Sequence, residues 1–232
     1  MSKEKNVVNS IKNNNNADDY GDNHVATSIQ TPLRDDAFDL NDQEKIEKIE
    51  HHFAKIMEAL GLDLNDESLS GTPHRVAKMY VKEVFYGLDP ANKPDAKKFG
   101  NKYKYEDMVV VKNNNVTSFC EHHFLPFIGK AHVAYMTTGK VIGLSKINRI
   151  VDYYSRRPQV QERLTLQIAD ELQNSLETED IAVWIESRHL CVSTRGIEDR
   201  ESSTVTAEYR GAFRQDKTQQ RFIDYINAKT EM

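Results

Sequence analysis

The pattern of apolar and polar positions divides the chain into a polar N-terminal stretch and a folded remainder. Residues 1–40 are polar, include four consecutive asparagines at 13–16, and carry few apolar side chains. So few apolar groups cannot offset the entropy lost when a chain becomes ordered. We therefore expect 1–40 to be a disordered tail.

Helical periodicity recurs on both sides of a β-rich middle. A first helix is expected from Asp42 to Gly61. A second helix is expected over 75–86, with Thr72 as its N-cap. Because its apolar residues lie nearly all round, we expect the second helix to be buried. Ser145 is expected to cap a helix through residue 154, and a final helix covers 219–228. The apolar stripes are Ile46, Ile49, Phe53, Ile56 and Leu60 in the first helix, and Val160, Leu164, Ile168, Leu172 and Leu176 in a long helix after Pro158.

Strands are predicted at 108–111, 127–136, 141–144, 181–192 and around 203–213, because β-branched and aromatic residues gather there between glycines. The order of these elements predicts an α+β fold, in which helices pack against a mostly antiparallel sheet. We expect a helical region at 41–88 and one catalytic domain at 89–232.

Composition narrows the classes of partner. The 232 residues carry a net charge of −5 and 38% hydrophobic residues, a balance that argues against nucleic-acid binding by the whole surface. No apolar run approaches the roughly 18 to 20 residues of a membrane span, and the N-terminus lacks the apolar stretch of a secretory signal. We therefore expect a cytoplasmic protein without a membrane partner.

The two cysteines of the chain lie in two short motifs that also hold three of its eight histidines. The motifs are Cys120-Glu121-His122-His123 and His189-Leu190-Cys191. Thiolate and imidazole together suit zinc, and three protein ligands leave one coordination position for water, as in catalytic sites. A disulfide is the alternative, but a reducing compartment favours a metal or catalytic role.

Adjacent histidines cannot both point the same way on a regular strand or helix. One of His122 and His123 can therefore join Cys120 on an ion, and the other is free for proton transfer; a loop after residues 116–119 would bring Cys120 and His123 together. On a predicted strand, His189 and Cys191 share one face, and only one of them need bind metal. The alternative for Cys191 is a small core side chain. By contrast, the adjacent histidines His51 and His52 have no cysteine nearby, and we interpret them as surface residues.

A basic strip between residues 138 and 163 suggests an anion site within this acidic protein. A helix beginning at Ser145-Lys146 would present its N-terminal amides to phosphate oxygens, with Arg149 one turn further along. A solvated helix face is the alternative explanation. Beside the strip, Gln161 and Glu162 offer an amide and a carboxylate that could read the edge of a purine. The strip comprises Lys140, Lys146, Arg149, Arg156, Arg157 and Arg163.

The segments 118–124, 141–151, 157–165 and 189–196, together with 71–80, resemble the GTP cyclohydrolase I family in order and spacing, over about residues 43–226. The resemblance implies a tunnelling fold, in which antiparallel strands of several chains join into a β-barrel. It also implies a toroidal homodecamer with active sites at subunit boundaries.

The reaction implied by the resemblance converts GTP and water to 7,8-dihydroneopterin triphosphate and formate, the first step of tetrahydrofolate and pterin biosynthesis. It starts from attack of a zinc-activated water on guanine C8. The implied zinc ligands are Cys120, His123 and Cys191. The implied catalytic residues are His122, which would protonate N7, His189, which would manage the proton of the attacking water or act in the later steps, and Ser145 near the sugar. Glu162, assisted by Gln161, would bind guanine, and the triphosphate would be bound by Arg75, Lys146, Arg149 and Arg195.

Two rival functions remain on the same fold. A non-catalytic zinc or pterin-binding module would be expected to lack one of these site residues, and all of them are present. The related nitrile reductase of queuosine synthesis uses a cysteine nucleophile and a nicotinamide, and the Cys-Glu-His-His run argues against it.

Overall fold

The computed structural model describes residues 27–95, 98–137 and 139–229. The chain divides into two compact units, Met1–Pro32 and Leu33–Met232, and the elements described below belong to the second. Of the tail expected at 1–40, residues 1–26 lie outside the described residues. The boundary expected between 88 and 89 stays a prediction.

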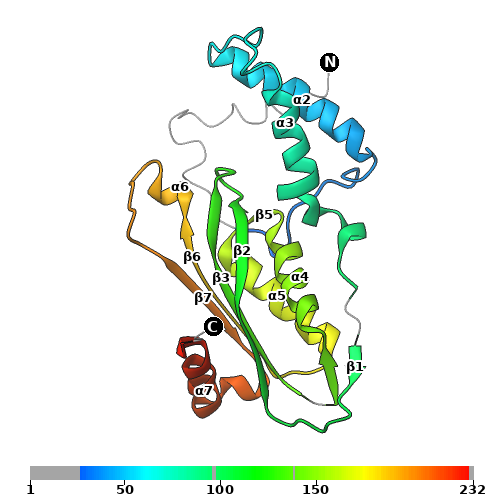
Figure 1. The fold of residues 1–232 in the computed structure, drawn as a ribbon, viewed down its shortest axis with the longest axis vertical. Helices are drawn as coiled ribbons and strands as arrows, with labels where there is room; N and C mark the ends of the chain where they lie inside the picture. Colours follow the sequence, from blue (N-terminus) through cyan, green and yellow to red (C-terminus); the bar gives the residue numbers. More distant parts are fainter. Residues whose placement is uncertain (1–26, 96–97, 138, 230–232) are drawn as a thin grey trace. The chain divides into compact units, whose positions relative to one another are not determined.

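The second unit has an α+β architecture, which confirms the fold class predicted from the sequence (Figure 1). None of its described helices combines the length and the apolar character that crossing a bilayer requires. In chain order the elements are α2 (Asp42–Ala59), α3 (Thr72–Met79), the π-helical turn η2 (Tyr80–Val84), the 3-10 turns η3 (Tyr86–Leu88) and η4 (Pro90–Asn92), β1 (Lys98–Gly100), β2 (Met108–Cys120), β3 (Pro126–Met136), β4 (Lys140–Ile142), α4 (Leu144–Ser155), β5 (Pro158–Gln159), α5 (Gln161–Leu176), β6 (Ile181–His189), α6 (Leu190–Ser193), β7 (Thr204–Tyr209), the 3-10 turn η5 (Gly211–Arg214) and α7 (Asp216–Asn227).

The main sheet has five strands in the order β5-β2-β3-β6-β7, and β1 pairs with β4 in a separate two-stranded sheet. All neighbours in the main sheet are antiparallel except β2 and β5. Strand β2 is much longer than the predicted 108–111, because pairing continues past a bulge between Val111 and Asn114. The Asn114 amide donates to the carbonyls of Val111 and Ala131, so this polar segment supplies partners for its own irregular backbone.

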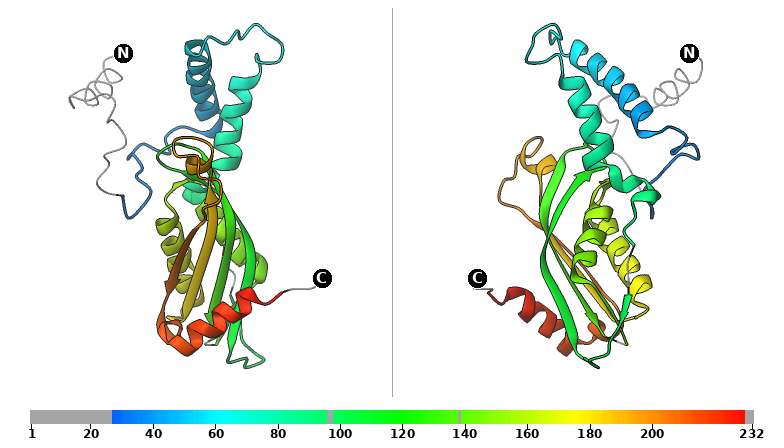
Figure 2. Two further views of the ribbon diagram at one scale, coloured as in Figure 1. Left: turned by 90° about the vertical axis from the view of Figure 1, so that its left-hand side faces the viewer. Right: turned by 45° about the vertical axis from the view of Figure 1, so that its right-hand side comes forward.

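Helices cover both faces of the sheet (Figure 2). On one face, α4 and α5 bury Ile147, Leu164 and Ile168 against strand residues such as Val133 and Ile185. On the other face, Phe213 of η5 and Phe222 of α7 pack on smaller side chains of β2, β3 and β6. The apolar stripe predicted for α5 is buried as expected from Leu164 to Leu176.

Strand register gathers the two cysteine motifs at one end of the sheet. Phe119 at the end of β2 pairs with Pro126 at the start of β3, and Phe127 pairs with His189 at the end of β6. The opposite end of β3 leads through β4 into the start of α4 (Figure 1). At about 3.3 Å per residue, the 11-residue β3 separates these two ends by roughly 35 Å.

Several helix predictions need correction. The N-cap of α3 is Gly71, and Thr72 is already helical. The predicted helix over 75–86 is also neither regular nor buried all round: it gives way to a π-helical turn at Tyr80, and Arg75 is exposed. Ser145 is likewise the second residue of α4, whose N-cap is Gly143, because the helix starts directly after the turn from β4.

Candidate active site

The turn between β2 and β3 positions both histidines of the first motif. The amide of Cys120 donates to the carbonyl of Leu125 at 2.8 Å, and the amide of Phe124 donates to the carbonyl of Cys120 at 2.9 Å. Phe124 has a left-handed φ of 55°, so the chain reverses sharply there. As a result, the Nδ1 atoms of His122 and His123 both lie 3.7 Å from the Cys120 sulfur.

The second motif is not one continuous strand, contrary to the prediction for 181–192. Strand β6 ends at His189, and Cys191 lies in the short helix α6. The change to helical backbone does not separate the two residues from the first motif. His189 and Cys191 line the same cavity of about 400 Å³ as Cys120, His122 and His123.

The ligand atoms of Cys120, His123 and Cys191 all lie within 4.8 Å of one another. Both cysteines are free thiols and buried. Burial, reinforced by the adjacent Cys120 sulfur, raises the pKa of the Cys191 thiol to about 11. The Cys191 thiol therefore ionises readily only when a cation binds it. Two sulfurs and one imidazole form a donor set that fits a soft or borderline metal ion such as zinc.

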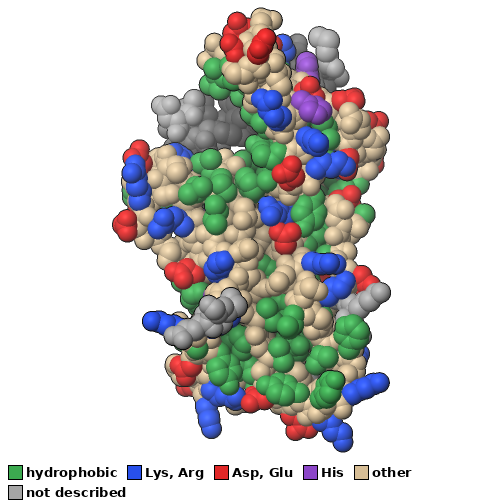
Figure 3. Space-filling view, viewed as in Figure 1, with side chains coloured by type: hydrophobic (Ala, Val, Ile, Leu, Met, Phe, Trp, Pro, Cys, Tyr) green, Lys and Arg blue, Asp and Glu red, His purple; other side chains and the backbone are tan. Residues whose placement is uncertain are grey.

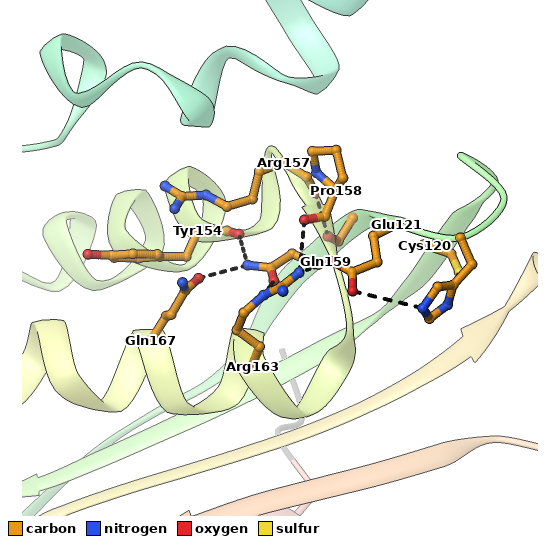
Figure 4. A network of polar contacts seen from close by, with 10 residues as sticks. Cys120, Glu121, Tyr154, Arg157, Pro158, Gln159, Arg163 and Gln167 are labelled. Atoms are coloured by element: carbon orange, nitrogen blue, oxygen red, sulfur yellow. Dashed lines mark hydrogen bonds and ion pairs between the residues drawn. The ribbon is translucent and has the colours of Figure 1, made fainter. Parts of the chain in front are cut away.

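His122 lies beside Glu121, whose carboxylate belongs to the polar network around Gln159 and Arg163 (Figure 4). Its Nε2 is 3.8 Å from one oxygen of Glu121, and the other oxygen forms an ion pair with Arg163. Arg163 is 4% exposed and also donates through Nε to Gln159 at 2.8 Å. No sequence pattern indicated this role of Glu121, and the basic strip of possible anion-binding residues included Arg163. A buried ion pair leaves Arg163 unavailable to a ligand.

His189 is fixed by aromatic and polar contacts. Its ring stacks on Phe127 with centroids 4.6 Å apart, and its Nε2 lies 2.8 Å from the side-chain oxygen of Gln161. Burial lowers the pKa of His189, so the neutral ring is favoured. Glu162, on the first turn of α5, is exposed and lines the cavity. Arg195 also lines it and donates to Nε2 of His123 at 2.8 Å.

Four predicted site residues do not line this cavity. Ser145, Lys146 and Arg149 lie at the start of α4, near the far end of β3. Arg75 lies on α3, where its guanidinium donates to the carbonyl of Ser68 and the hydroxyl of Thr72. Within one described chain, the predicted triphosphate site is therefore divided, and only Arg195 reaches the cavity.

Most of the basic strip serves the fold. Lys140 pairs with Glu177, Arg156 with Asp152, and Arg163 with Glu121. Arg157 is buried against the rings of Tyr153 and Tyr154. Charge counting alone could not separate these cations from Lys146 and Arg149, because burial and pairing depend on the tertiary fold.

The α+β fold holds a cavity walled by cysteine, histidine and glutamate, and three of these side chains could hold a metal ion. The chain belongs to the GTP cyclohydrolase I family, whose model matches residues 49–227.

Relatives match almost the whole chain. It is 57% identical over 221 residues to GTP cyclohydrolase 1 of Flavobacterium johnsoniae, covering 95% of this chain and 99% of that protein. It is 52% identical over 199 residues to GTP cyclohydrolase 1 of Aeromonas salmonicida, covering 85% of this chain and 90% of the relative. Among solved structures, the apo form of the archaeosine synthase QueF-Like covers 47% of this chain and 98% of its own, with a TM-score of 0.40 and 16% identity.

Proposed function

We propose that this chain hydrolyses GTP to 7,8-dihydroneopterin triphosphate and formate, the first step of tetrahydrofolate and pterin biosynthesis. The observation that supports the proposal most is the cavity itself. It brings the Cys120, His123 and Cys191 group together with His122, His189 and Glu162, in a chain of this family.

Cys120, His123 and Cys191 would hold a zinc ion, and bound zinc supplies a water acidified enough to act as a nucleophile near neutral pH. Residues around the metal site would then act as general acid and general base. His122 would donate a proton to N7 of guanine as the C8–N7 bond breaks; the C8–N9 bond must also break, with a second proton going to N9, before C8 can leave as formate. His189 would accept the proton that the attacking water loses. Ser145 would assist at the ribose.

Substrate binding would orient the guanine ring against these groups. The Glu162 carboxylate is exposed in the cavity and can accept hydrogen bonds from guanine N1 and N2. Arg195 lies on the same wall and would bind the triphosphate. Its present partner, Nε2 of His123, is a neutral acceptor, and a phosphate oxygen offers a stronger, charge-assisted bond.

The remaining phosphate ligands would come from other copies of the chain. Neither Lys146 nor Arg149 lines the cavity of its own chain, so each would serve the cavity of another copy. Apolar side chains also gather at the surface (Figure 3). Among the large exposed ones are Phe99 and Leu144 near the start of α4, and Ile128 and Val205 on the sheet. Exposed apolar surface of this kind is typical of an interface. We propose the toroidal homodecamer with its shared barrel as the assembly that covers it.

The proposed location is the cytoplasm. The two free thiols fit a reducing compartment. GTP is the proposed small-molecule partner; the proposal includes no nucleic acid and no membrane.

Incubation of the zinc-loaded protein with GTP is expected to release formate and a pterin in equal amounts. The assay follows pterin absorbance together with enzymatic detection of formate, and a chelator-treated sample serves as the control. Loss of both products after chelation, and their return with added zinc, would support the proposal. A zinc-replete assembly that forms neither product would instead favour a pterin- or purine-binding module on the same fold.

Subunit mixing tests whether the site is shared. Cys191→Ser and Lys146→Ala should each be nearly inactive alone, because one lacks a metal ligand and the other a phosphate ligand. Co-expressed with distinct tags, they should regain activity, since random mixing leaves about a quarter of shared sites with both residues intact. Cys191→Ser mixed with His122→Ala is the matched control, because both changes affect one cavity wall. Equal activity of the two mixtures would place Lys146 outside the shared site.

A further inference from the structure

Gln161 is the first residue of α5 and lines the cavity, but its side-chain amide is occupied by partners within the protein. The residue is 2% exposed. Its Nε2 donates toward the carbonyls of Ile185 and Thr204, at 3.1 and 3.0 Å, and toward the hydroxyl of Thr206 at 3.1 Å. A carbonyl can only accept, so these contacts fix which end of the amide is nitrogen.

The other end of the amide is therefore the oxygen, and it too is occupied. Oε1 of Gln161 accepts from the hydroxyl of Ser187 and faces Nε2 of His189 at 2.8 Å. An amide oxygen cannot donate, so Nε2 of His189 must carry the hydrogen. In the neutral ring, the lone pair then lies on Nδ1.

The His189 ring has little freedom to leave this arrangement. It stacks on Phe127 at an interplanar angle of 14°, and the two residues are partners in the β3–β6 register. The hydroxyl of Ser187 also lies 3.3 Å from Nε2. Stacking fixes the plane of the ring, and the Gln161 oxygen fixes which nitrogen holds the proton.

We propose that Gln161 is a positioning residue that acts through His189, rather than a residue that contacts guanine. It holds Nε2–H of His189 and, together with the stack on Phe127, fixes the plane and orientation of a ring that lines the cavity. Guanine recognition then falls to the neighbouring Glu162, which is exposed where Gln161 is buried. This inference rests on the proposed function for the reaction that His189 serves.

Steady-state kinetics separate the two roles of Gln161. Gln161→Met keeps the length of the side chain and removes the amide, so we expect kcat to fall on the order of 10- to 100-fold with little change in KM for GTP. Glu162→Gln is the contrasting variant and should act mainly on KM. Zinc content and assembly size, measured on each variant, verify that the site is still built. A raised KM with unchanged kcat for Gln161→Met would overturn the proposal.

A double-mutant cycle tests whether Gln161 acts through His189. In a His189→Ala background, Gln161→Met should cause no further loss of kcat, because the ring that it positions is gone. The same loss in both backgrounds would show that Gln161 acts independently of His189, and the proposal would be wrong.

The tautomer of His189 can be measured on the wild-type enzyme, with His189→Ala used only to assign the signal. Solid-state NMR of the assembled enzyme labelled with ¹⁵N-histidine should show that Nε2 of His189 carries a hydrogen. A ring with no hydrogen on Nε2 would overturn the proposal. If the wild-type enzyme formed no pterin, the proposed function would fail, and this spectrum would still decide the Gln161–His189 contact.

Discussion

Cys191→Ser is expected to abolish formate release because the protein can no longer retain zinc. Only three side chains in the described chain form the candidate metal group, and Cys191 contributes one of its two sulfurs. A serine hydroxyl stays protonated at neutral pH and is a poor zinc ligand. The loss should exceed the roughly 100-fold typical of removing a hydrogen bond that supports a metal ligand. Metal analysis after dialysis, formate release and thermal unfolding are the measurements.

The neighbouring residues of α6 supply a control for this variant. Ser193 lies in the same helical turn and is also buried. Ser193→Ala should therefore retain zinc and activity, whereas Cys120→Ser should resemble Cys191→Ser. A Cys191→Ser protein that keeps its full zinc content would remove Cys191 from the ligand set.

The periodicity of apolar residues correctly predicted elements that bury one apolar stripe against one neighbouring element. Helix α5 shows this well, because Leu164, Ile168 and Leu172 meet one face of the sheet. The pattern was misleading where an apolar segment packs loosely. The segment after Thr72 is only partly buried and becomes a π-helical turn at Tyr80. Strand β2 was underestimated because polar asparagines pair as strand residues when a long partner such as β3 is available.

The candidate site likewise has parts that a local sequence pattern predicts and parts that depend on the tertiary fold. Cys120 and His123 are close in sequence, so a turn is enough to bring them together. The pairing of Glu121 with Arg163 and of Gln161 with His189 depends on how α5 meets the sheet. No local pattern encodes that packing. The start of α4 is a third case, since the place of Lys146 in a binding site would depend on another copy of the chain.

His122→Ala is expected to leave zinc bound and to lower kcat by roughly 10² to 10⁴, the usual contribution of a general acid or base. The Nδ1 of the imidazole lies 3.7 Å from the Cys120 sulfur, and its Nε2 lies 3.8 Å from the Glu121 carboxylate. Arg163 keeps that carboxylate in place from a buried position. This arrangement orients the ring beside the metal group without making it a member. Rapid-quench measurement of formate in a single turnover reports the chemical step directly.

His123→Ala is the matched comparison, because both histidines present Nδ1 to the same sulfur at the same 3.7 Å. Distance alone does not distinguish them, whereas their other contacts do: His122 faces a carboxylate, and His123 accepts from Arg195 at 2.8 Å. We expect His123→Ala to lose zinc and His122→Ala to lose turnover with zinc retained. The reverse result would exchange their assignments, with His122 as the ligand. Near-normal turnover of a zinc-replete His122→Ala enzyme would leave His122 a structural role and require the proton for N7 to come from another group in the cavity.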